Sequence, residues 1–119
     1  PKVIAYNAKN EEAKTRYAVI ADYMHLGGNT EDEKVAALIE YVRGMNDKLN
    51  IPHCIKNYGG DSYPTEQGFV PEDVFLERLP EIAANAILDA CTGSNPRQPS
   101  QEDMEKLLKC CYYDTEVDF

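Results

Sequence analysis

The sequence predicts an all-α fold, a bundle of about five helices, and three observations support this class. Apolar residues recur at three- and four-residue steps in several segments, which places them on one face of a helix. Helix-start signals precede two of these segments, and no segment has a convincing strand pattern. The chain has 119 residues, of which 43% are hydrophobic, so it fits one helical domain over residues 1–119.

The first two long helices are predicted from their apolar stripes and their ends. One is expected over Asn10–Met24, with Gly27-Gly28 ending it. The next begins at a capping box, Thr30–Glu33, and cannot continue past Pro52. Its apolar stripe consists of Val35, Leu38, Ile39, Val42, Met45 and Leu49.

A long loop and three further helical segments follow. Residues Ile51–Gly68 contain too many glycines and prolines for a regular element, so we expect a long loop there. A short helix is expected over Pro71–Arg78, after which Pro80 breaks the helix and restarts it. The restarted helix runs to about Ala90, and Ser100 caps a last helix.

Charge excludes two classes of partner. Twelve basic residues against twenty-one acidic ones leave a formal net charge of −9. Such a chain repels phosphate backbones and anionic lipid, so we expect no nucleic-acid partner and no membrane partner. No stretch reaches the roughly 18 consecutive apolar residues of a spanning helix.

The cysteines and the first residues predict where the chain resides and what it is part of. Four cysteines without framework spacing favour a reducing cytosol. The segment Pro1–Asn7 reads as part of an element already under way, which predicts a fragment; removal of an initiator methionine before proline would give the same start. His25 and His53 lack partners at metal-ligand spacing, so we expect no metal site and no catalytic residue in this chain.

One turn stands out as a candidate site, the segment Asp89–Arg97 between two predicted helices. It places a thiol in a small polar turn that could line a cleft. Cys91 is expected to be a poor nucleophile, because it follows the negative end of a helix dipole and lies near Asp89. The alternative is a plain helix stop, in which Gly93 takes the left-handed conformation and Arg97 satisfies exposed carbonyls.

Four strings of the chain resemble a known family. They are RYAVIADYMHLGG, TEDEKVAALIEYV, NIPHCIKNYG and DACTGSNPRQPSQEDMEKLLKCCYY. Their order and spacing are similar to the C-terminal helical region of iron-dependent (group III) alcohol dehydrogenases over nearly the whole chain. The CTG form most resembles lactaldehyde reductases (1,2-propanediol oxidoreductases), ahead of the alcohol dehydrogenase half of bifunctional aldehyde-alcohol dehydrogenases.

The resemblance implies a function for a parent protein and a smaller role for this chain. The parent would use iron and NAD to interconvert a short aldehyde and its alcohol, in a cleft between a nucleotide-binding domain and the helical domain. The family's iron ligands belong to helices upstream of the matched stretch, so this chain alone should bind neither cofactor. The residues that carry over as cleft wall, facing substrate or cofactor, are Cys91, Thr92, Gly93 and Asn95.

The fragment interpretation implies two kinds of partner, and one other function competes with it. A fragment would leave apolar faces that the remaining part of the same enzyme or a homo-oligomer must cover. The alternative is a stand-alone acidic helical module, without enzymatic activity, that binds a partner through an apolar groove. An exposed apolar patch where absent helices packed would favour the fragment.

Overall fold

The computed structural model describes residues 1–58 and 70–119, and all regular secondary structure among them is helical, with no strand. This confirms the predicted all-α class. The predicted loop falls outside the described residues from 59 onward, and a short 3-10 helix forms just before that point. The elements are α1 (Lys2–Asn7), α2 (Glu11–Tyr23), α3 (Glu31–Lys48), η1 (Ile55–Asn57), α4 (Glu72–Leu88), η2 (Thr92–Ser94) and α5 (Gln101–Tyr113).

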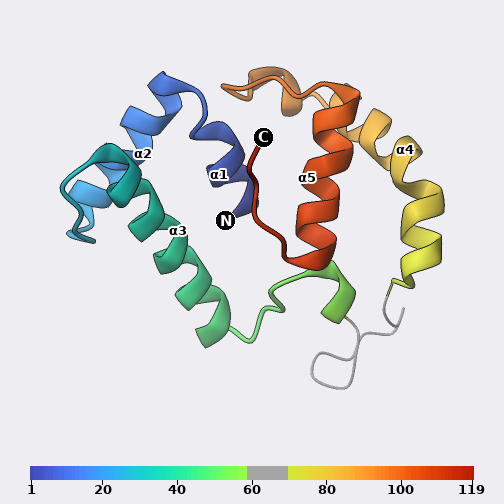
Figure 1. Ribbon diagram of the computed structural model, residues 1–119, viewed down its shortest axis with the longest axis horizontal. Helices are drawn as coiled ribbons and strands as arrows, with labels where there is room; N and C mark the ends of the chain where they lie inside the picture. Colours follow the sequence, from blue (N-terminus) through green and yellow to red (C-terminus); the bar gives the residue numbers. More distant parts are fainter. Residues whose placement is uncertain (59–69) are drawn as a thin grey trace.

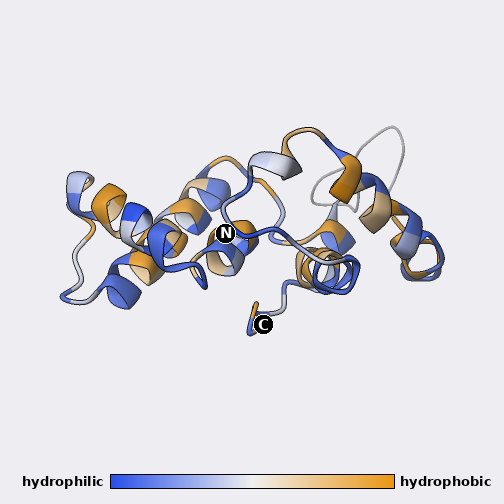
Figure 2. Ribbon diagram, turned by 90° about the horizontal axis from the view of Figure 1, so that it is seen from above, coloured by the Kyte–Doolittle hydropathy of each residue, from blue (hydrophilic) through white to orange (hydrophobic). Residues whose placement is uncertain are grey.

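The helices form two pairs with α1 between them (Figure 1). Helices α2 and α3 pack together on one side, and α4 packs along α5 on the other. Helix α1 contacts both α3 and α5. Seen from above, the molecule is a shallow layer (Figure 2), with extents of 42 × 32 × 23 Å. None of its described helices has the length and apolarity needed to cross a membrane.

Local capping explains where three helices begin. The Asn10 side chain accepts a hydrogen bond from the Ala13 amide at the start of α2. Thr30 with Glu33 forms the predicted capping box of α3, and Ser100 forms a second one with Asp103 at α5. These side chains satisfy backbone amides that a helix start leaves without partners.

The turn between α2 and α3 requires glycine at one position. Helix α2 ends at Tyr23, before the predicted Gly27-Gly28 stop, and the chain then turns through positive-φ residues. At Gly28 φ is +102°, and a Cβ there would lie 2.9 Å from the Lys34 amide nitrogen. Any side chain at position 28 would therefore clash with the first turns of α3.

The predicted break at Pro80 is wrong, because α4 is one continuous helix from Glu72 to Leu88. Proline removes one helical hydrogen bond, and that cost is met by packing. Phe75, Leu79 and Ala83 follow one another at four-residue steps and are all buried. A break would rotate the later residues away from this shared face.

Two kinds of packing hold the helix pairs together. Phe75 on α4 stacks on Tyr112 of α5, with ring centroids 4.1 Å apart, and Leu79 completes this cluster. The α2–α3 pair instead buries small residues of α2 against Val35 and Leu38 of α3. These small residues, which let two helices approach closely, are Ala13, Ala18 and Ala21.

Candidate functional site

Three of the four predicted site residues line one apolar cavity. Cys91, Thr92 and Asn95 lie along it, whereas Gly93 is exposed and does not line it. The cavity has a volume of about 290 Å³ and is bounded by α1, η2 and α5. Its lining consists of Val3, Tyr6, Cys91, Thr92, Asn95, Pro99, Met104, Leu107, Leu108 and Cys111.

The turn that carries these residues is a 3-10 helix, which corrects the predicted helix stop. Gly93 is not among the positive-φ glycines, and Asp89 leaves α4 in an extended conformation. The Thr92 hydroxyl donates to the Ala86 carbonyl at 2.6 Å. The Asp89 carboxylate accepts from the Cys91 amide at 2.8 Å. Side chains within the turn thus replace the left-handed residue that we expected.

A reciprocal pair of amides joins the turn to α1. Asn7 Nδ2 donates to Asn95 Oδ1 at 2.9 Å, and Asn95 Nδ2 donates to Asn7 Oδ1 at 2.8 Å. Asn95 Nδ2 also donates to the Arg97 carbonyl. Asn7 is only 3% exposed, so this pair satisfies polar atoms that burial would otherwise leave without partners.

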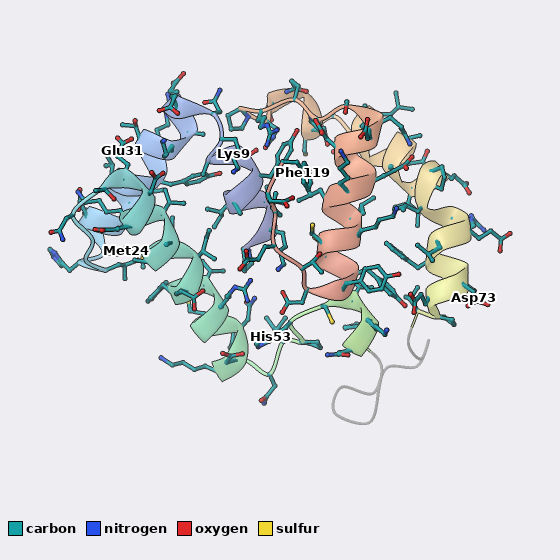
Figure 3. The ribbon with its side chains drawn as sticks, in the orientation of Figure 1. Lys9, Met24, Glu31, His53, Asp73 and Phe119 are labelled. Atoms are coloured by element: carbon teal, nitrogen blue, oxygen red, sulfur yellow. The ribbon has the colours of Figure 1, made fainter. Side chains whose placement is uncertain are left out.

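Arg97 joins the same turn to α1 and to the C-terminal segment. Its Nη1 donates to the carbonyls of Tyr6 (3.0 Å) and Phe119 (2.8 Å). Its guanidinium carbon lies 3.9 Å from the centroid of the Tyr6 ring. Arg97 therefore does satisfy carbonyls, as predicted, but not those of the preceding helix. Phe119 lies beside α1 and packs against Tyr6 (Figure 3).

The Tyr6 phenol closes the contact between α1 and α5. It donates to Asp103 Oδ2 at 3.3 Å, next to the capping box of α5. Burial raises the pKa of Tyr6, and the Arg97 charge opposes that shift only in part. The phenol is therefore neutral near pH 7 and acts as a hydrogen-bond donor.

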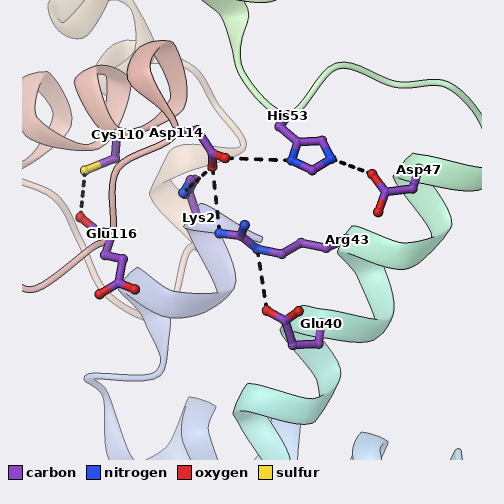
Figure 4. Close-up of polar contacts among 8 residues, drawn as sticks. All are labelled: Lys2, Glu40, Arg43, Asp47, His53, Cys110, Asp114 and Glu116. Carbon is purple, nitrogen blue, oxygen red and sulfur yellow. Dashed lines mark hydrogen bonds and ion pairs between the residues drawn. The ribbon is translucent and has the colours of Figure 1, made fainter.

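Sequence analysis missed a cluster of charged side chains around Asp114 (Figure 4). The Asp114 carboxylate lies 2.7 Å from Lys2 Nζ, 3.8 Å from Arg43 Nη2 and 3.8 Å from His53 Nδ1. His53 also pairs with Asp47 through Nε2. A hydrogen bond from Lys2 is the main cause that lowers the Asp114 pKa.

No local signal could have found this cluster, because its members come from α1, α3, the following linker and the end of α5. It joins two acids and one histidine to two cations, a composition typical of ion pairing. Among residues 1–58 and 70–119, no group of three or more His, Cys, Asp or Glu is placed to hold a metal ion.

The sequence of residues 1–112 matches the family described as "Fe-containing alcohol dehydrogenase family, C-terminal". The chain belongs to this family. Over all 119 residues it is 43% identical to an NADPH-dependent butanol dehydrogenase of Clostridium saccharobutylicum, of which it covers 28%. It is 40% identical to an aldehyde-alcohol dehydrogenase of Clostridium acetobutylicum over 97 residues, which are 82% of the chain and 10% of that protein.

The family resemblance is thereby confirmed, whereas the preference for lactaldehyde reductases is not supported. The lactaldehyde reductase of Escherichia coli (strain K12) is 29% identical over 107 residues, 90% of the chain and 24% of that protein. This is well below the identity with the butanol dehydrogenase. The chain spans less than a third of the length of these three relatives.

Proposed function

We propose that this chain is the C-terminal cleft wall of an iron-dependent, NAD(P)-linked alcohol dehydrogenase that interconverts a short aldehyde and its alcohol. The observation that supports the role most directly is the cavity beside η2. Cys91, Thr92 and Asn95 line this cavity from a turn that hydrogen bonds fix to α1 and α4. A fixed wall can hold a substrate in one orientation at low entropic cost.

We assign iron and NAD(P) to the remaining part of the same enzyme. The described residues of this chain offer no ligand set for a metal ion. The role left for this chain is to bind and orient substrate and to exclude water. It would not catalyse alone.

Exposed apolar side chains support the need for a covering partner. Tyr23 at the end of α2 is 86% exposed, and Leu88 at the end of α4 is 83% exposed. Other large apolar side chains on α2, α3 and α4 are also exposed, including Val19, Ile20, Tyr41, Met45, Val74, Leu76 and Ile82. We assign these faces to the rest of the parent protein and to a second copy of it.

Substitution of Cys91 tests the cleft-wall role. In the full-length protein, Cys91→Ser should raise the Michaelis constant for a short aldehyde several-fold and leave the bound iron unchanged. The matched control is Cys54→Ser, because Cys54 lines a different cavity. Loss of iron in Cys91→Ser with an unchanged Michaelis constant would count against the proposal.

A non-enzymatic acidic module that binds a partner through an apolar groove is the second candidate. The net charge of −9 is compatible with it, whereas the exposed apolar side chains favour the fragment. Intact mass decides between the two when the protein is expressed from its natural start. A denatured mass well above that of 119 residues supports the dehydrogenase. A mass that matches 119 residues, with no companion chain under native conditions, supports the module.

A further inference from the structure

The segment after α5 lies outside the stretch of sequence that matches the family. That match ends at residue 112, whereas residues 114–119 leave the end of α5 and run between α5 and α1 (Figure 1). The Cys110 thiol of α5 donates to the Glu116 carbonyl at 3.2 Å. The Lys106 ammonium lies 5.6 Å from the centroid of the Phe119 ring. Contacts with α5 therefore hold the segment in its middle and at Phe119.

Phe119 contacts the first helix as well as the last. Its ring packs against the ring of Tyr6, with centroids 5.9 Å apart and an angle of 55° between the ring planes. Its backbone carbonyl and that of Tyr6 accept from the same Arg97 nitrogen, Nη1, at 2.8 and 3.0 Å. The Arg97 guanidinium also lies over the Tyr6 ring. The position of Arg97 therefore depends on α1 and on Phe119 together.

Arg97 in turn is joined to the wall of the η2 cavity. Its backbone carbonyl accepts from Asn95 Nδ2 at 2.6 Å. The next side chain, Gln98, donates to the carbonyls of Thr92 and Asn95 at 3.1 and 2.8 Å. Thr92, Asn95 and Tyr6 all line the cavity, whereas Phe119 is not part of its lining. A chain of contacts thus runs from Phe119 through Arg97 to the residues of the cavity wall.

We infer that Phe119 is a positioning residue for the η2 cavity and acts on it through Arg97 and Tyr6. The inference rests on the proposed function and adds to it what holds the cleft wall in place. A wall that orients substrate must keep its position, because a shift of about 1 Å caused by a distant substitution can lower a rate about hundredfold. The segment after α5 would therefore affect the reaction without touching the substrate.

Hydrogen exchange of the full-length protein tests this inference without relying on activity. The amides of Thr92, Ser94 and Asn95 donate hydrogen bonds within the turn, so their exchange reports its opening. Phe119→Ala removes one aromatic pair, and we expect these amides to exchange about tenfold faster. The amides of α3, which the chain of contacts does not include, should keep their exchange rates.

Two further variants make the exchange result specific. Thr115→Ala is the matched control, because Thr115 belongs to the same segment and is exposed, and it should leave the exchange of the turn unchanged. Arg97→Lys keeps the positive charge but loses the planar guanidinium that stacks on Tyr6. It should accelerate exchange of the turn in the same way, and it serves if Phe119→Ala does not fold. Equal acceleration in η2 and in α3 would show a general loss of stability and overturn the inference.

Kinetics with a short aldehyde separates failure of this inference from failure of the proposed function. Phe119→Ala should lower kcat/KM about tenfold and leave the bound iron unchanged, whereas Phe119→Tyr, which keeps the ring, should retain the wild-type value. An active enzyme in which Phe119→Ala leaves either the exchange of the turn or kcat/KM unchanged would overturn the inference alone. Faster exchange of the turn in a full-length protein without dehydrogenase activity would overturn the proposed function alone.

Discussion

The two ends of helix α1 are fixed by opposite chemistry. At its first residue, the Lys2 ammonium pairs with the Asp114 carboxylate after α5. At its last residue, the Asn7 amide forms the reciprocal pair with Asn95 in the turn before α5. Both Lys2 and Asn7 are buried, with 8% and 3% of their surface exposed.

The difference shows what each kind of contact can do for a short helix. Six residues are too few for α1 to be stable alone, so these tertiary contacts hold it in place. A charged pair is strong at close range but depends on pH and on salt. A neutral amide pair has no such dependence, and its geometry fixes the turn beside the candidate cavity.

Removing the charge at the first end should have the largest effect. Asp114→Asn keeps a residue that tolerates the left-handed conformation there (φ 59°). It leaves the buried Lys2 ammonium without its close counter-charge. We expect a loss of about 3 kcal/mol in the free energy of unfolding, near the lower end for a broken buried pair because Asp114 is partly exposed. Urea denaturation measures this. A loss of stability smaller than that of Asn7→Ala would reverse the ranking of the two ends.

Removing the amide at the second end should cost somewhat less. Asn7→Ala removes two of the three side-chain hydrogen bonds of the half-buried Asn95 amide, for an expected loss of about 2 kcal/mol. A double-mutant cycle with Asn95→Ala isolates the pair, with an expected coupling of about 1 kcal/mol or more. Additive losses in the two single variants would show that the amides do not act as a unit.

Acid should weaken the Lys2–Asp114 contact and leave the Asn7–Asn95 contact unchanged. Because Lys2 holds the Asp114 pKa below its ordinary value of 3.8, the stability from this pair is complete above that value. It is lost as the pH falls through the lowered pKa of the folded state. The unfolding free energy of Asp114→Asn should therefore decline less in acid than that of the wild type. The Asn7→Ala variant should decline as steeply as the wild type.

The smallest effect concerns an alkaline titration at the end of α5. A hydrogen bond to Glu72 raises the pKa of Tyr113 to about 12. Stability from this bond is complete below pH 10, the ordinary value, and is lost between there and about 12. Glu72→Gln should move the Tyr113 pKa back toward 10, as ultraviolet absorbance of tyrosinate would show. Both ends of α1 should remain unaffected, which makes this variant a control for the acid experiment.

Helices α2, α3 and α5 could be predicted from the sequence because their signals are local. The capping boxes of α3 and α5 each lie within four residues, and the apolar stripes repeat every turn. Pro80 was misjudged because the packing of Phe75 and Leu79 on α5 outweighs a local hydrogen bond.

The candidate site was predictable only in part. The resemblance placed Cys91, Thr92 and Asn95 in one turn, and the structure brings all three to one cavity. Gly93, which the same resemblance implied, does not line that cavity, and it does not take the left-handed conformation of the alternative helix stop. The partners of Asn95 and Asp114 are far apart along the chain, and no local pattern announces such contacts.

The amide pair also bears on how this chain can change during evolution. Asn7 and Asn95 are separated by 88 positions, and each uses both ends of its amide on the other. A substitution of either one leaves the amide of the other without these hydrogen bonds. A lineage that loses one asparagine therefore gains little by keeping the other. We expect the two positions to covary among relatives, which makes them a long-range signal readable from an alignment alone.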